Sequence, residues 1–470
     1  MLLFGRLRNM GLHFQPMKSF YISLVIGLFL SLPFFTAGAQ STKKPNIIFI
    51  LADDLGRHQI GAYGSTFYET PHIDKLAKNG LKFSNAYAAS PVCSPTRASI
   101  MTGKHPARLH LTDYIPGRSS KNSKLITPNW KKELPLEEIT IAEVLKDAGY
   151  ATGHFGKWHL NKDKKYKLGR PGDPGSQGFD DVLTTHKPGA GPKSKFDEDW
   201  HHVREITERS IAFIKKNKDQ PFFCYVTHNS IHDPEIEKKS LIEKYAKKPE
   251  LKKLKTNNPK QAAMLETLDK SIGTILDTLE DLELENNTLV VFNSDNGQKG
   301  SKEGKPFRGS KGDLYEAGIR MPLIIRWPGV VKPGTESAQF VISNDFFPTF
   351  TDLAGGISKE KDIDGVSLLP VLRDSGAKLT RESLCWHYPH YHGLGIAPSG
   401  AIRKGRYKLI EWFEKSAYGE DGAYELYDLM SDPGESKNLS ASMKDKTAEL
   451  KSELEAWRDQ VGAQMMPRRK

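Results

Sequence analysis

KPNIIFILADD, residues 44–54, is the stretch that decides the fold expected for this chain. It is a short apolar run rich in β-branched residues, and it ends in two carboxylates, Asp53 and Asp54. Continuous apolar runs of this length are typical of strands that a parallel sheet buries on both faces. We therefore predict a buried strand that opens onto a loop.

Further apolar runs follow, and helical patterns separate them. The runs are YATGHFGKWHL (150–160), PFFCYVTHNSIHDP (221–234), NTLVVFNSDNG (287–297) and MPLIIRWPG (321–329). Helix-period repeats lie at 70–79, 135–150 and 260–284. Strands that alternate with helices predict an α/β fold with a doubly wound, mostly parallel sheet flanked by helices. Such sheets carry their chemistry at the carboxyl ends of the strands.

The character of the chain changes near residue 360. The stretch LCWHYPHYHGLGIAPSGAIRKGRYKLIEWFE (384–414) consists of short alternating runs separated by turn residues. It predicts a short antiparallel sheet, closed by a helix at 446–459. We expect a larger domain at 44–360 and a smaller C-terminal α+β subdomain at 361–470 that completes the substrate pocket.

Residues 1–39 have the features of a secretory signal peptide. Three basic residues and no acidic residue accompany the apolar run FYISLVIGLFLSLPFF, and Ala37-Gly38-Ala39 provides a small-residue cleavage site. Either Met1 or Met17 can be the start of this signal. We expect the secretion machinery to export the protein to the periplasm or the medium, without a stable membrane span.

Charge and cysteine content narrow the expected partners. The formal net charge is +11, and without the three basic residues of the signal it is +8. This excess fits either ordinary solubility or attraction of an anionic substrate. No nucleic-acid-binding motif is recognisable, so nucleic acid is not an expected partner. The three cysteines allow at most one disulfide, and a leftover thiol in an exported protein needs an explanation.

Oxygen-bearing side chains follow two of the predicted strands. They are Asp53 and Asp54 after the first strand, and Asp295 and Asn296 after NTLVVFNS. Carboxylate and amide oxygens are hard ligands, which suit Ca²⁺ or Mg²⁺ better than zinc. We expect a metal site where these two strand ends meet.

Cationic and imidazole side chains lie in the same parts of the chain. Arg97, Lys157 and Lys311 are candidate clamps for an anionic group, and His159 and His232 are candidate proton donors or acceptors. We expect His58 and His105 to be structural or supporting groups.

Cys93 begins CSPTRASIMTG (93–103), which is expected to be the first part of a helix. A thiol at a helix N-terminus is expected to be acidified, which favours a nucleophilic cysteine. However, no Cys-His hydrolase signature surrounds it.

CSPTRASIMTG is similar to the C-x-P-[ST]-R-x-x-x-[ML]-T-G signature of the type I, formylglycine-dependent sulfatases of the alkaline phosphatase superfamily. GYATGHFGKWHL (149–160) resembles the second signature of that family. NIIFILADDLG (46–56), FNSDNG (292–297) and FRGSKGDLYEAGIRMP (307–322) resemble it in the expected order. The resemblance extends over residues 44–459. Within the family, the chain resembles the bacterial polysaccharide sulfatases and the arylsulfatase A-like sulfatases. The resemblance implies an alkaline phosphatase-like fold and a sulfuric ester hydrolase.

The resemblance implies that Cys93 is a precursor. A formylglycine-generating enzyme or an anaerobic sulfatase-maturating enzyme would oxidise it to Cα-formylglycine, and this aldehyde hydrates to a geminal diol. A Ca²⁺ ion, rather than Mg²⁺, would contact that diol and the sulfate. The resemblance implies that its other ligands are Asp53, Asp54, Asp295 and Asn296.

The resemblance also implies roles for the remaining residues. Arg97 would stabilise the nucleophilic oxygen, and Lys157 and Lys311 would bind the sulfate. His232, with Lys311, would protonate the leaving oxygen. His159 would take the proton that allows sulfate to leave. His228 also fits the position assigned to His232. We favour His232 because it directly precedes the Asp233-Pro234 step.

A sulfated carbohydrate is the substrate that the resemblance suggests. In WHYPHYHGLG (386–395), the rings of His387 and His390 are expected to contact the sugar, although the segment can equally be a packed loop. Two alternatives remain open. One is a phosphonate or phosphate ester hydrolase of the same superfamily, and the other is a non-catalytic protein that binds sulfated glycans with an unmodified Cys93.

Overall fold

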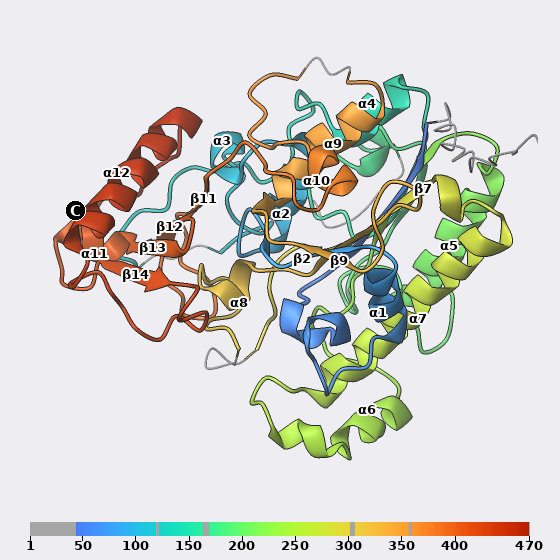
Figure 1. Ribbon diagram of the computed structural model, residues 1–470, viewed down its shortest axis with the longest axis horizontal. Helices are drawn as coiled ribbons and strands as arrows, with labels where there is room; N and C mark the ends of the chain where they lie inside the picture. Colours follow the sequence, from blue (N-terminus) through green and yellow to red (C-terminus); the bar gives the residue numbers. More distant parts are fainter. Residues whose placement is uncertain (1–43, 119–121, 163–168, 301–305, 357–359, 470) are drawn as a thin grey trace, which may run out of the picture. The chain divides into compact units, whose positions relative to one another are not determined.

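The computed structural model describes residues 44–118, 122–162, 169–300, 306–356 and 360–469 (Figure 1). The predicted signal peptide at 1–39 lies outside the described residues. The remainder, Lys43–Lys470, groups as one compact unit. Within the described ranges, no helix has both the length and the apolar character needed to cross a membrane.

The main sheet has eight strands. In spatial order they are β5 (Asp181–Thr184), β4 (Ala151–Gly156), β6 (Phe222–Thr227), β1 (Asn46–Ala52), β7 (Thr288–Ser294), β8 (Leu323–Arg326), β2 (Leu81–Phe83) and β9 (Thr335–Ser337). All neighbouring pairs are parallel except the two that β8 forms, with β7 and with β2. The predicted mostly parallel α/β sheet is therefore confirmed.

Helices cover both faces of this sheet (Figure 1). One face carries α2 (Cys93–Thr102), α4 (Ile141–Asp147), α9 (Phe346–Leu353) and α10 (Leu369–Arg373); the other carries α1 (Pro71–Lys78), α5 (Val203–Lys216) and α7 (Pro259–Asp281). Because strand side chains alternate, β1 contributes Phe49 and Leu51 to the first core and Ile48 and Ile50 to the second. Burial on both faces explains the unbroken apolar run that opens the chain's folded part.

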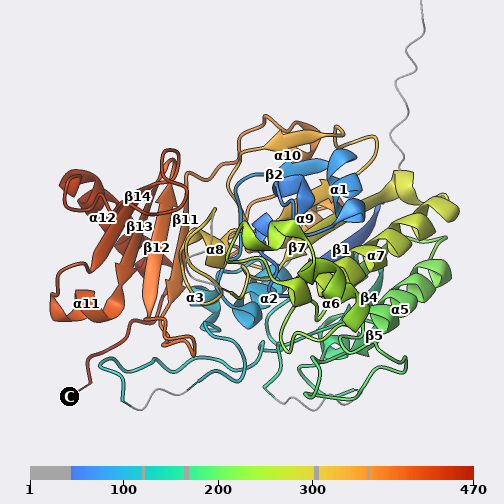
Figure 2. The same cartoon turned by 90° about the horizontal axis from the view of Figure 1, so that it is seen from below.

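A second sheet forms near the C-terminus (Figure 2). It is antiparallel and comprises β11 (Ser383–Tyr388), β12 (Ser399–Lys404), β13 (Tyr407–Trp412) and β14 (Tyr424–Asp428). Leu450 and Leu454 of α12 (Lys444–Val461) pack on one face of it. Trp386 and Ile410 on the opposite face pack against Tyr87 and Tyr315 of the larger part. The short antiparallel sheet and its closing helix are confirmed, and the domain boundary at residue 360 stays a prediction.

Smaller elements connect these layers. They are the paired strands β3 (Ala86–Tyr87) and β10 (Val341–Ile342), and the short helices α3 (Pro106–Leu109), α6 (Lys239–Ala246), α8 (Glu316–Ile319) and α11 (Phe413–Tyr418). In the lysine-rich stretch at 235–255, Lys244 and Lys248 form ion pairs with Glu69, and Lys244 also pairs with Glu266. The basic run in the sequence predicts either a solvated helical insertion or a lid over the substrate, and these pairs fit the insertion better.

The strand register aligns the ends of four neighbouring strands. In β1, Leu51 pairs with Thr227 of β6 and Ala52 pairs with Ser294 of β7, while Gly156 of β4 also pairs with Thr227. The residues that follow these strands therefore emerge at one level. This is the edge at which parallel sheets place their ligands.

Candidate active site

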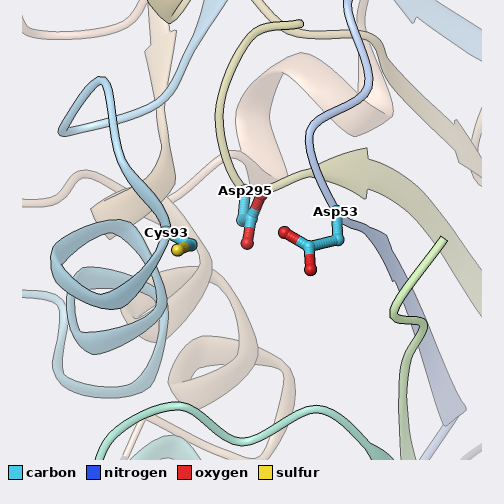
Figure 3. A group of neighbouring side chains, drawn as sticks. All are labelled: Asp53, Cys93 and Asp295. Carbon is cyan, nitrogen blue, oxygen red and sulfur yellow. The ribbon is translucent and has the colours of Figure 1, made fainter. Parts of the chain in front are cut away.

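The two predicted pairs of oxygen-bearing side chains meet at this edge. Asp53 and Asp295 follow the adjacent strands β1 and β7, and Figure 3 shows their side chains close to one another and to Cys93. The backbone N–H of Asp54 donates to Oδ1 of Asp295 at 3.3 Å, and the side-chain amide of Asn296 donates to Oδ1 of Asp54 at 2.8 Å. All of these side chains are buried, so their charges need partners.

Arg97, one turn along α2 from Cys93, supplies one such partner. Its Nε and Nη2 lie 2.8 Å and 2.7 Å from Oδ2 of Asp295, and its Nη1 donates to the carbonyl of Lys157 at 2.7 Å. Burial alone would lower the pKa of Arg97, but Asp295 and Asp53 raise it above its ordinary value. Burial and the nearby Asp53 raise the pKa of Asp295 to about 6.

Two lysines complete the cationic side. Nζ of Lys157 lies 2.6 Å from Oδ2 of Asp53, and Nζ of Lys311 lies 2.6 Å and 2.8 Å from the two carboxylate oxygens of Asp54. Burial opposes ionisation of Asp54, but Lys311 and other nearby cations hold its pKa well below the usual range. Burial likewise opposes charge on Lys157 and Lys311, yet the carboxylates raise the pKa of both amines. The two lysines are therefore charged and face the cavity.

The oxygen cluster fits a hard divalent cation. Oδ1 of Asp53 and Oδ1 of Asn296 are buried without a hydrogen-bond donor. Ligand atoms of Asp53, Cys93 and Asp295 lie within 4.8 Å of one another, as do those of Asp53, Asp54 and His232. Buried oxygens without donors are the groups that a bound cation would satisfy.

Cys93 begins α2 at the edge of this cluster. Its Sγ lies 3.3 Å from Nδ1 of His159, whose Nε2 lies 2.6 Å from the carbonyl of Ile115. A carbonyl only accepts, so the ring proton is on Nε2, and Nδ1 accepts from the thiol. Burial raises the pKa of Cys93 more than Lys157 and Lys311 lower it. The expectation of an acidified thiol was wrong, because desolvation outweighs the charges of the two lysines.

His232 lines the cavity, whereas His228 does not. Nδ1 of His232 donates to the carbonyl of Asp233 at 2.6 Å, so Nε2 faces the site, 3.8 Å from Oδ2 of Asp54. Burial is the main cause that lowers the pKa of His232 to about 4. His228 is fully buried, and its ring lies 3.4 Å from the hydroxyl of Ser271 on α7.

These groups form the floor of a cavity of about 440 Å³. Cys93, Lys157, His159, His232 and Lys311 all line it. Loops supply the walls, with Tyr114, Ile115, Pro116, Asn161, Thr185, His186, Lys187, Asn229, Asp233, Lys299, His392, Gly393 and Leu394 among the lining residues. The sequence predicts that three segments outside the strand ends set specificity, namely 185–195, the lysine-rich stretch at 235–255 and 386–395. The first and the last reach this cavity, and the lysine-rich stretch is not among its lining residues.

The structure does not bring His387 and His390 to the cavity. Alternation along β11 turns His387 towards the side covered by α12, where its Nε2 contacts the carbonyl of Gln464 at 2.9 Å. His390 is buried against Thr112 and Trp130. The histidine of this segment that lines the cavity is His392. His58 is buried outside the lining, and His105 contacts the N–H of Ala107 and the carbonyl of Cys385, which fits the structural role expected for both.

Comparison with known proteins agrees with this geometry. A protein-family model described as Sulfatase matches residues 45–357, more than half of the chain. The chain belongs to the sulfatase family. A second model, described as N-sulphoglucosamine sulphohydrolase, C-terminal, matches residues 310–460 of this sulfatase. The predicted family and the predicted sulfuric ester hydrolase are thus confirmed.

The relatives of this sulfatase match it along most of its length. A sulfatase of Formosa agariphila is 31% identical over 94% of both chains. An N-acetylgalactosamine-6-O-sulfatase of Bacteroides thetaiotaomicron is 30% identical, covering 89% of this chain and 94% of the relative. The solved structure of Ps i-CgsB in complex with k-i-k-neocarrahexaose has a TM-score of 0.73 at 27% identity, covering 88% of this chain and 93% of that one.

Sequence reasoning missed part of the cavity walls. Tyr114, Ile115 and Pro116 come from an irregular segment, and Lys299 lies beyond the SDN turn. Neither position follows a strand directly, so the strand-end pattern that located the floor gives no signal for them. The nearness of Tyr114-Ile115-Pro116 to Cys93 arises only in the folded chain.

Proposed function

We propose that this sulfatase is exported and hydrolyses a sulfate monoester of a sulfated saccharide, using Cα-formylglycine made from Cys93 and a Ca²⁺ ion. The observation that carries the proposal is the placement of Cys93. Its side chain lies beside the carboxylates of Asp53 and Asp295, and it faces the bare Nδ1 of His159. That arrangement supplies metal ligands, a reacting group and a proton acceptor at one point.

The proposed Ca²⁺ would be held by Asp53, Asp54, Asp295 and Asn296, with an oxygen on residue 93. The unsatisfied oxygens of Asp53 and Asn296 support this ligand set. When bound, the ion supplies positive charge that offsets charge on the sulfate oxygens. Oxygen ligands suit both Ca²⁺ and Mg²⁺, so the choice of Ca²⁺ is itself part of the proposal.

The proposed modification by a maturation enzyme replaces the thiol of Cys93 with an aldehyde. When hydrated, that group supplies two hydroxyls, one that attacks sulfur and one whose proton must be removed before sulfate leaves. Nδ1 of His159 is placed to accept that proton, because it already faces Sγ of Cys93 at 3.3 Å. Arg97 would stabilise the nucleophilic oxygen electrostatically.

The cations around the cavity bind and orient the sulfate. Lys157 and Lys311 direct charged amines to the floor. Lys311 and His232 are the groups placed to donate a proton to the leaving alcohol oxygen. The neutral ring of His232 has no proton on Nε2, so this nitrogen can donate only after the ring is protonated. An arriving sulfate anion favours the protonated ring.

The walls of the cavity support a saccharide substrate. The rings of Tyr114 and His392 meet edge to face, with centroids 5.7 Å apart, and both line the cavity. Aromatic faces of this kind pack against the apolar face of a sugar ring. The relatives described above include an N-acetylgalactosamine-6-O-sulfatase and a structure with a bound neocarrahexaose, which also supports a carbohydrate. The signal pattern at 1–39 supports export.

Mass spectrometry of the peptide that contains Cys93 tests the proposal. In active protein made together with a maturation enzyme, this peptide should lack one sulfur and two hydrogens and gain one oxygen. The peptide with buried Cys224 should keep its thiol, which provides the control. Full activity with an unmodified Cys93 would contradict the mechanism.

Kinetics separates the sulfatase from a phosphonate or phosphate ester hydrolase of the same superfamily. We expect a higher kcat/KM for aryl sulfates than for matched aryl phosphonates and phosphate esters. Equal or better turnover of the phosphorus esters would favour that alternative.

A further inference from the structure

The segment Asp113–Pro116 joins the catalytic floor to the rest of the molecule. The carbonyl of Ile115 accepts the hydrogen bond from Nε2 of His159 at 2.6 Å. The N–H of Ile115 donates to Oγ of Ser94 at 3.1 Å, and Ser94 is fully buried directly after Cys93. Ser94, which directly follows Cys93, therefore holds the peptide group of Ile115, whose carbonyl contacts His159.

A second contact holds the same segment from the C-terminal sheet. Tyr388, the last residue of β11, is fully buried, and its hydroxyl donates to Oδ1 of Asp113 at 2.8 Å. The same oxygen accepts from the N–H of Tyr114 at 2.9 Å. In both Figure 1 and Figure 2, β11 lies beside α3, on the side of the second sheet that faces the larger part. The second sheet thus reaches the catalytic floor through Asp113.

The orientation of the Ile115 carbonyl decides which nitrogen of His159 carries the proton. A neutral imidazole has one N–H, on either Nδ1 or Nε2. The carbonyl can only accept, so it retains the proton on Nε2 and leaves Nδ1 as an acceptor towards residue 93. A carbonyl that turns away removes this preference and allows the other tautomer, in which Nδ1 cannot accept a proton.

We propose that Ser94 and Tyr388 are positioning residues, which hold the Ile115 carbonyl so that His159 presents a bare Nδ1 to residue 93. Ser94 acts on the Ile115 peptide directly, and Tyr388 acts through Asp113. Neither side chain lines the cavity, so neither contacts the substrate. The tautomer of His159 can be tested with either a thiol or an aldehyde at residue 93. The consequence for turnover rests on the function proposed above.

In turnover, Nδ1 of His159 takes the proton of a hydroxyl on residue 93. The bond from the residue 93 carbon to the sulfate oxygen breaks with its electron pair leaving on sulfate, and the aldehyde carbonyl forms. Loss of the acceptor slows this release and leaves the earlier attack on sulfur unchanged. We therefore expect kcat and KM to fall together at constant kcat/KM, by about tenfold to a hundredfold in kcat.

The first experiment reads the tautomer without any activity. Protein with an unmodified Cys93 is labelled with ¹⁵N-histidine, and the ring nitrogen shifts of His159 are assigned with the variant His159→Gln. The parent should show a protonated Nε2, and Ser94→Ala and Tyr388→Phe should show a growing share of protonated Nδ1. The control is Tyr63→Phe, which removes another tyrosine hydroxyl that donates to the carbonyls of Phe83 and Leu323. Unchanged His159 shifts in both test variants would overturn the proposal.

The second experiment uses protein with a modified residue 93, and the aldehyde content of every variant is measured first. Ser94→Ala and Tyr388→Phe should retain sulfate on the Cys93 peptide during turnover, with the paired fall of kcat and KM. A fall in kcat/KM alone, with neither retained sulfate nor a shifted His159 tautomer, would indicate a structural role and contradict the positioning role. If the tautomer shifts but no variant carries sulfate on this peptide, the positioning role stands and the formylglycine mechanism fails.

Discussion

At the scale of single residues, the oxygen cluster contains buried acceptors that a cation would satisfy. Asp53 already pairs with Lys157 through Oδ2, so the unsatisfied Oδ1 needs a further positive partner. Asn296 is in the same state, because its amide nitrogen donates to Asp54 and its oxygen has no donor. A ligand that binds only the folded state stabilises that state in proportion to its occupancy.

We expect Ca²⁺ to raise the Tm of protein stripped with a chelator, and Asp53→Asn to remove most of this rise. At a hundredfold excess over Kd the stabilisation is about 2.7 kcal/mol. Differential scanning calorimetry with and without Ca²⁺ measures it. Asp180→Asn, which breaks a surface ion pair with Lys146, should keep the full response. A rise of equal size in Asp53→Asn would place the ion elsewhere.

Tyr114 tests the saccharide part of the proposal. Its ring lines the cavity wall and meets the ring of His392 edge to face. We expect Tyr114→Ala to raise KM for a sulfated saccharide by about tenfold, since the packing of one ring against an aromatic side chain is worth roughly 1–2 kcal/mol. The KM for a small aryl sulfate should change little. Equal losses on both substrates would argue against a sugar at this wall.

At the scale of elements, the end of β4 depends on the close approach of two strands. Gly156 has φ of 125°, and a Cβ at this position would lie 1.8 Å from the carbonyl oxygen of Thr227 in β6. The next residue, Lys157, donates its N–H to the same carbonyl at 2.8 Å. Only glycine allows this approach, and it determines where the Lys157 side chain begins.

Gly156→Ala should therefore lower both stability and activity. We expect a loss of roughly 1–3 kcal/mol in the free energy of unfolding, because alanine cannot adopt the positive φ of this position without strain. We also expect a fall in kcat/KM as Lys157 shifts. Urea denaturation and sulfate-release assays measure the two effects. The matched control is Gly149→Ala, at a positive φ of 86° with nothing within 4 Å, which should lose stability without the loss of activity.

At the scale of the whole molecule, a buried charge cluster joins the second sheet to the first part. Nζ of Lys408 in β13 lies 3.0 Å from Oε1 of Glu316 in α8 and 2.9 Å from Oε1 of Glu435, and all three side chains are fully buried. Lys408 is thus shared by two carboxylates, and Glu316 also pairs with Nη1 of Arg320 at 3.2 Å. Removing one member of such a cluster leaves a buried charge without compensation.

Lys408→Met should cost roughly 3–5 kcal/mol in the free energy of unfolding, because two buried carboxylates lose their shared partner. Lys404→Met, on the neighbouring strand β12, removes a partly exposed ion pair with Glu453 of α12 and should cost at most about 1 kcal/mol. Urea denaturation of both variants measures the difference. Similar losses in the two variants would show that the cluster contributes little to stability.

Glu435 gives this cluster a pH dependence. Burial and the nearby carboxylate of Glu316 raise the pKa of Glu435 from its ordinary value of 4.5 to about 7, and Lys408 only partly offsets the effect. The folded protein then binds this proton more tightly than the unfolded chain, so the stability contribution is lost as pH rises from about 4.5 to about 7. Unfolding curves at several pH values should show Glu435→Gln gaining stability relative to the parent over that interval. A constant difference would contradict the raised pKa.

The floor of the site could be predicted because its residues follow strands whose patterns are local. Asp53, Lys157, His232 and Asp295 each lie within a few residues after an apolar run, and parallel strands place such positions at one edge. The walls could not be predicted in the same way. The choice of His392 over His387 and His390 depends on which face of β11 is covered by α12 and on how the following loop packs.

By itself, the sequence determined the class of fold, the strand ends that carry the polar groups, and the signature around Cys93. These properties are set by residue types at short spacing, which local hydrophobic burial and backbone preference translate directly into strands and helices. Only the tertiary structure decided that the Cys93 thiol is not acidified and that His159 keeps its proton on Nε2. Both depend on desolvation and on a carbonyl from Ile115, 44 residues away along the chain, and such contacts exist only after the chain has packed.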